Sequence, residues 1–282
     1  MTVEMTEQFA DFLASRWQGG FFHSYEITRH AAWHTWRAHH GGLIVPWSSG
    51  TLAQAAQNWS WTETPSLPTF AELASALQQA IMRQDQMRAQ QVCFDLFIWG
   101  NVARRADDAS RVWVKRQAAA GTLTDSLAQA VALLSPSAQT SLAPFHQDGL
   151  LMNSATTKLY AAAARDGRVA IYDSRVGAAL GLLARQFLEE QDVEGVPESL
   201  HYRWGPPQSK AQVAARTRDP STARHVFLQL PNGAHSHGIR AALSRRANQL
   251  FEAVCRRLRQ QGQRCTFLDL ERALFMVGYR VR

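Results

Sequence analysis

Two stretches decide the fold of this 282-residue chain: Leu151-Met152-Asn153-Ser154-Ala155-Thr156-Thr157-Lys158-Leu159-Tyr160 and Arg168-Val169-Ala170-Ile171-Tyr172-Asp173-Ser174-Arg175-Val176-Gly177. The first holds one of only three lysines in the chain. After the second, apolar residues recur at spacings of three and four, which predicts a helix with one buried face. Asp173 stands directly before this helix, and aspartate is a preferred N-cap residue.

The segment between the two stretches predicts that the chain doubles back. Residues 154–164 are rich in alanine and predict a helix, with Asn153, Ser154 and Thr156 as candidate caps. Asp166-Gly167 is typical of a turn. From Lys158 the helix would rise about 10 Å before the turn. The extended return to Asp173 could cover about 17 Å, which brings Asp173 beside the amino end of the lysine helix.

Most of the remaining chain also shows helical periodicity. We expect helices at 7–18, 24–39, 69–81, 86–103, 107–119, 124–134, 239–258 and 266–277, with few strands and an irregular stretch at 41–68. In the helix at 239–258, one set of residues is expected to face inward: Ile239, Leu243, Leu250, Val254 and Leu258. A second set is expected on its solvated face: Arg240, Arg245, Arg246, Arg256, Arg257 and Arg259.

The composition points to an anionic partner. The chain has 30 basic and 23 acidic residues, and 27 of the basic residues are arginine because lysine occurs only at 115, 158 and 210. A cationic surface binds nucleic acid by releasing counterions from phosphate. The alternative is that the arginine enrichment reflects a GC-rich genome. The three cysteines have no metal-site or disulfide spacing, so we expect no metal and no cofactor. The amino end has no basic-then-apolar signal and no run approaches 18 apolar residues, so we expect a cytoplasmic protein.

The order of helix, turn, extended return and helix-opening aspartate resembles the core of the helix-hairpin-helix DNA glycosylases. Thr157-Lys158 matches the position of that family's lysine, and Tyr172-Asp173-Ser174-Arg175-Val176 matches the segment around its aspartate. The hairpin position here is Leu151–Ala155, which contains no glycine, and Arg175 stands where the family has a histidine. The resemblance is therefore to a distant branch.

The resemblance implies a mainly α, two-lobed fold with a cleft between the lobes. Residues 1–68 and 166–282 would form an outer lobe, and residues 69–165 would form an inserted helical bundle. The implied function is excision of a modified base from double-stranded DNA after the nucleotide is flipped out, in defence against phage DNA. Asp173 would stabilise the charge on the sugar or orient water towards it, and Lys158 would either act as a nucleophile in an AP-lyase step or hold a phosphate. The residues expected to bind substrate are Tyr172, Trp99, Asn153, Arg175, His201, Tyr202 and Trp204.

Two other classes of function remain open from the sequence. The chain could be a non-catalytic, arginine-rich DNA-binding or regulatory protein on the same scaffold. It could also be a helical enzyme for a small anionic substrate, with His201, Lys210 and Arg218 as binding residues.

Overall fold

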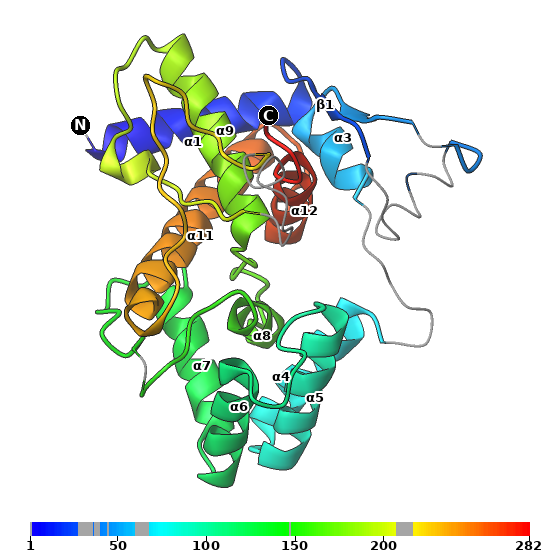
Figure 1. Cartoon of the computed structure of the whole chain (residues 1–282), viewed down its shortest axis with the longest axis vertical. Helices are drawn as coiled ribbons and strands as arrows, with labels where there is room; N and C mark the ends of the chain where they lie inside the picture. Colours follow the sequence, from blue (N-terminus) through cyan, green and yellow to red (C-terminus); the bar gives the residue numbers. More distant parts are fainter. Residues whose placement is uncertain are drawn as a thin grey trace. The chain divides into compact units, whose positions relative to one another are not determined.

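The computed structural model describes residues 2–27, 36, 40–43, 45–59, 68–146, 148–206 and 217–282, and this part of the chain is mainly helical (Figure 1). The chain divides into two compact units. The first comprises Met1–Thr62, Asp173–Leu230 and Leu250–Arg282, and the second comprises Glu63–Tyr172 and Pro231–Gln249. The sequence places the boundaries at 68/69 and 165/166 and assigns 231–249 to the outer lobe.

The first unit contains most of the amino-terminal and carboxyl-terminal elements. These are α1 (Thr2–Gln18), β1 (His23–Tyr25), β2 (Trp47–Ser49), α3 (Leu52–Gln57), α9 (Ser174–Glu190), the 3-10 turn η2 (Glu198–Leu200) and α12 (Phe267–Val277). β1 and β2 pair antiparallel, with Tyr25 opposite Trp47. α12 packs on α3 and α9. The core of this unit is therefore built from segments that are far apart in the sequence.

The second unit is a bundle of consecutive helices. Its elements are α4 (Phe70–Met82), α5 (Gln86–Trp99), α6 (Ala109–Ala119), α7 (Leu123–Leu134), α8 (Thr156–Ala163) and the 3-10 turn η3 (Ala234–Ser236). α4 packs on α5 and α8, and α7 also packs on α8 (Figure 1). Every residue of α8 is buried. Helix α11 (His237–Gln260) supplies residues to both units.

Helix boundaries that depend on local capping are predicted correctly. Thr69 and Glu72 form a capping box at the start of α4, and Thr266 and Asp269 form another at α12. The carboxylate of Asp173 accepts hydrogen bonds from the first amides of α9, so the expected N-cap is confirmed.

Three local predictions are wrong. Ser24, expected in a helix, lies in β1, while most of 24–39 is outside the described residues. The stretch 41–68 was expected to be irregular but contains β2 and α3, whose Thr51 cap accepts a hydrogen bond from the Gln54 amide. In α11 the expected inward residues Leu243, Leu250, Val254 and Leu258 are buried, but Ile239 is 41% exposed and Arg240, expected on the solvated face, is 8% exposed. Only the first turn of the helix therefore departs from the expected face.

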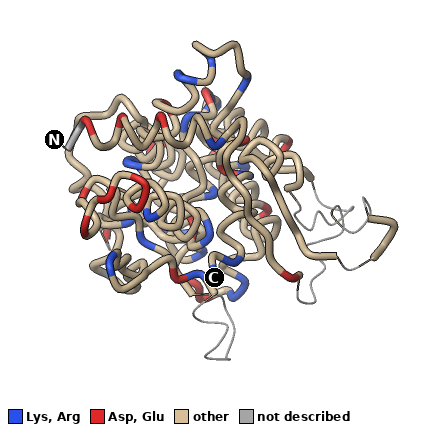
Figure 2. The backbone as a smooth tube through the Cα atoms, turned by 90° about the horizontal axis from the view of Figure 1, so that it is seen from above, with Lys and Arg blue, Asp and Glu red and all other residues tan. Residues whose placement is uncertain are grey.

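Basic and acidic positions are interspersed along the backbone (Figure 2). Arg257 pairs with Glu7 and Asp11, and Arg224 pairs with Asp192 at 2.7 Å. These pairs neutralise individual arginines locally and leave the net charge of +7 unchanged. Within the part of the chain that the structure describes, no helix has the length and apolar character needed to span a membrane.

Candidate functional site

Lys158 is a buried lysine in the first turns of α8. Its side chain is only 6% exposed, and its Nζ donates a hydrogen bond to the carbonyl of Ser154 at 2.9 Å. A Cβ added at Gly100 would lie 2.5 Å from the Cδ of Lys158, so the alkyl chain passes directly over this glycine. Burial of a lysine is costly, and it marks Lys158 as different from a solvated surface lysine.

The extended return after α8 is held by hydrogen bonds at two points. The Tyr172 amide donates to Thr157 Oγ1 at 3.1 Å. The Ala170 amide donates to Asn248 Oδ1 at 3.0 Å, and Asn248 in turn donates to the Leu134 carbonyl. Tyr172, directly before Asp173, is therefore hydrogen-bonded to Thr157, directly before Lys158. The expectation that the chain doubles back to the amino end of α8 is confirmed for the segment up to Tyr172.

Asp173 begins the next part of the first unit and caps α9. Its Oδ1 accepts the Arg175 amide at 2.8 Å and the Val176 amide at 3.1 Å. Its neighbour Ser174 accepts a hydrogen bond from Arg218 Nη1 at 3.2 Å. One carboxylate oxygen is thus occupied by the helix amides, and the carboxylate lies beside a cationic group.

Two arginines surround Asp173 within the first unit. The guanidinium of Arg175 stacks 4.2 Å above the Phe275 ring, and 5.1 Å from the Tyr279 ring centroid. Arg218 is 8% exposed, and burial together with the charge of Arg175 lowers its pKa to about 10. Burial also lowers the pKa of Arg175, while the Asp173 carboxylate raises the pKa of both guanidinium groups. The carboxylate therefore stabilises two charges that burial disfavours.

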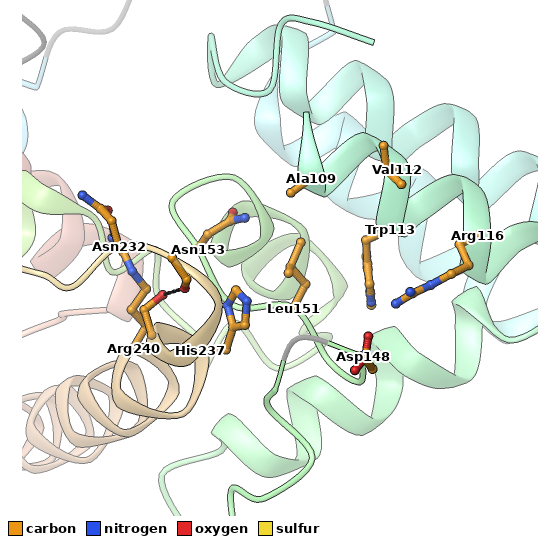
Figure 3. Close-up of a pocket in the computed structure, with 12 residues that line it drawn as sticks. Ala109, Val112, Trp113, Arg116, Asp148, Leu151, Asn153, Asn232, His237 and Arg240 are labelled. Carbon is orange, nitrogen blue, oxygen red and sulfur yellow. Dashed lines mark hydrogen bonds between the residues drawn. The ribbon is translucent and has the colours of Figure 1, made fainter. Parts of the chain in front are cut away.

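Asn153 lines a pocket within the second unit (Figure 3). Its Oδ1 accepts the amides of Ala155 and Thr156, so it caps the start of α8, and its Nδ2 donates to Ser110 at 2.9 Å. The pocket has a volume of about 450 Å³. We call it the α6–α11 pocket. Its wall consists of Ala109, Val112, Trp113, Arg116, Asp148, Leu151, Asn153, Asn232, Gly233, Ser236, His237 and Arg240.

The remaining residues expected to bind substrate lie mostly in packed surroundings. Tyr202 and Trp204 are 0% and 4% exposed in the first unit, and Trp204 donates to the Phe227 carbonyl. His201 stacks on the ring of Phe227. In the second unit, Trp99 packs on Phe70 with ring centroids 4.8 Å apart.

One candidate residue lies outside the described residues, and two residues of the pocket were not among those expected from the sequence. Lys210, one of the binding residues considered for a small anion, belongs to the residues that the structure does not describe. Arg240 and His237 were not among the residues expected to form a site. Helical periodicity placed Arg240 on the solvated face, where an arginine would hold a phosphate only near a cleft. The loop Pro231-Asn232-Gly233, which precedes η3 and α11, was a further sequence signal.

Comparisons of the chain with protein-family models, with curated proteins and with solved structures found no match. The residues themselves must therefore carry any functional argument.

Proposed function

We propose that the protein is a DNA N-glycosylase, with Asp173 and Lys158 as its catalytic residues. The observation that carries this proposal is the hydrogen bond between the Tyr172 amide and Thr157 Oγ1. It joins the chain neighbours of the two residues, as expected from the resemblance to the helix-hairpin-helix glycosylases. The burial of Lys158 supports the same assignment.

The proposed chemistry gives each residue one role. As the N-glycosidic bond breaks, its electron pair leaves with the base, which takes up a proton, and positive charge develops at C1′. The Asp173 carboxylate would stabilise that charge, and preorganised electrostatics is usually the largest catalytic contribution. The Lys158 amine would form a new C–N bond at C1′. The C1′–O4′ bond would then break, and the proton lost from the nitrogen would pass to O4′, which opens the sugar ring and leaves a Schiff base that precedes strand scission.

Base release from a panel of DNA substrates tests the proposal. The panel contains undamaged, uracil, 8-oxoguanine, alkylated and cytosine-modified phage DNA, and strand breaks are measured with and without alkali. Asp173→Asn is the informative variant, because asparagine caps a helix as well as aspartate does but carries no charge. We expect it to abolish base release while DNA affinity is retained.

Lys158→Gln tests the lyase step, with Lys115→Gln as its matched control because Lys115 is exposed on α6. We expect borohydride to trap a covalent DNA complex with the wild type and with Lys115→Gln, and none with Lys158→Gln. Release of base by the wild type without trapping would restrict the protein to glycosylase activity. DNA binding without release from any substrate would contradict the proposal and favour the non-catalytic DNA-binding protein.

A further inference from the structure

The α6–α11 pocket contains a buried cation that no carboxylate neutralises. Arg240 is 8% exposed, and burial lowers the pKa of its guanidinium. Tyr172 is the ionisable neighbour that raises this pKa. Its Nε donates to the Pro231 carbonyl at 2.9 Å, and its Nη2 donates to Asn232 Oδ1 at 3.1 Å. Both acceptors are neutral. Within the described part of the chain, Arg240 forms no ion pair, although buried charges in proteins are normally paired.

The groups around Arg240 are also suited to an anion. Gly233, Ser236 and His237 line the pocket where α11 begins, and the amino end of a helix carries partial positive charge. His237 Nδ1 lies 2.9 Å from the Met152 carbonyl, so the ring is fixed in orientation. In Figure 3, Asn232, His237 and Arg240 lie on one side of the pocket, and Val112, Trp113 and Arg116 from α6 lie on the other.

The size and charge of the pocket indicate the class of ligand. Arg116 and Arg240 outnumber the one carboxylate in the wall, Asp148. The volume of about 450 Å³ is within the range of roughly 300–1,000 Å³ that holds organic ligands, and is larger than an inorganic ion requires. Leu151, Val112 and Trp113 add apolar surface. A ligand with one anionic end and a larger organic body would satisfy these features.

We propose that the α6–α11 pocket binds a nucleotide-sized phosphate ester, with the phosphate on Arg240 at the start of α11. The ester could be a free nucleotide or one nucleotide of a DNA strand, and both present the same phosphate chemistry. The proposal requires no glycosylase activity.

The test is calorimetric binding of deoxyadenosine monophosphate, deoxyadenosine, inorganic phosphate and a short single-stranded oligonucleotide. We expect binding of the monophosphate and none of the nucleoside, which lacks the charge. Binding of the oligonucleotide alone would assign the phosphate to a strand, and binding of the free nucleotide would assign it to a small molecule. Failure of every phosphate-containing probe to bind at millimolar concentration would overturn the proposal.

Two variants assign the binding to Arg240. Arg240→Gln should weaken binding about 10- to 100-fold, the loss expected when a charge-assisted hydrogen bond is removed. Asn232→Asp should do the same without deleting the arginine, because it places a carboxylate against Arg240 Nη2, and Asn232 is exposed, so the fold should tolerate the change. The matched control is Arg88→Gln, which removes an exposed charge from α5. Equal binding by Asn232→Asp and wild type, or equal weakening by Arg88→Gln, would refute the site.

Discussion

Replacing Thr157 by valine tests whether the return segment is held as described. Thr157 is 1% exposed, and its hydroxyl accepts the Tyr172 amide. Valine has almost the same shape, so the substitution leaves no large cavity but removes the acceptor. The Tyr172 amide would then lose this hydrogen bond in a buried position, at a cost of about 1–3 kcal/mol. We expect the free energy of unfolding to fall by that amount.

Thr157→Ser separates the hydrogen bond from packing. Serine keeps the hydroxyl and loses one methyl group, which costs about 0.8 kcal/mol. Urea unfolding followed by circular dichroism gives both values. If the proposed function is correct, Thr157→Val should also slow base release more than Thr157→Ser at a temperature where both variants are folded. A valine variant as stable as the serine variant would refute the role assigned to this hydrogen bond.

Three further predictions concern other parts of the chain. Gly100→Ala should destabilise by about 1–3 kcal/mol through overpacking against Lys158, and the loss should shrink when Lys158→Ala is added, as thermal melts of the double-mutant cycle would measure. Burial lowers the pKa of His23 below 6.5, so as pH falls the unfolded chain binds a proton at this histidine before the folded protein does. The free energy of unfolding should therefore decrease as pH falls through and below 6.5. His23→Gln should make this pH dependence shallower in thermal melts recorded across pH. Burial raises the pKa of the Cys93 thiol, and a hydrogen bond with Cys255 together with burial raises the pKa of the Cys265 thiol. Because the thiolate is the reactive form, iodoacetamide should label neither cysteine in the native protein and both after unfolding. Mass spectrometry of the labelled protein measures this.

Local signals were sufficient for much of the fold. The caps at Thr69, Asp173 and Thr266 depend on residues within three positions of one another, and the structure confirms all three. The strands β1 and β2 could not be predicted in this way. Each has three residues and is stabilised by a partner more than twenty positions away, so no periodicity develops within either one.

For the candidate sites, the sequence predicted that the chain returns to the start of α8 but not that Arg240 is buried. The turn at Asp166-Gly167 and the reach of the return predicted that Tyr172 approaches the start of α8, which Thr157 confirms. The burial of Arg240 depends instead on the carbonyl oxygen of Pro231 and the side-chain Oδ1 of Asn232, both of which accept hydrogen bonds from its guanidinium. A helical pattern contains no information about a loop that folds over one of its residues, so this arginine was assigned to the wrong face.

The two units differ in the order in which ribosomal synthesis could complete them. α4, α5, α6, α7 and α8 follow one another along the chain and can pack as they emerge. α3, by contrast, packs on α12, whose first residue is Phe267. At about 5–20 residues per second, the wait between these two helices is about 10–40 s. During that interval, Leu52 and Ala55, the buried residues of α3, lack the packing of α12.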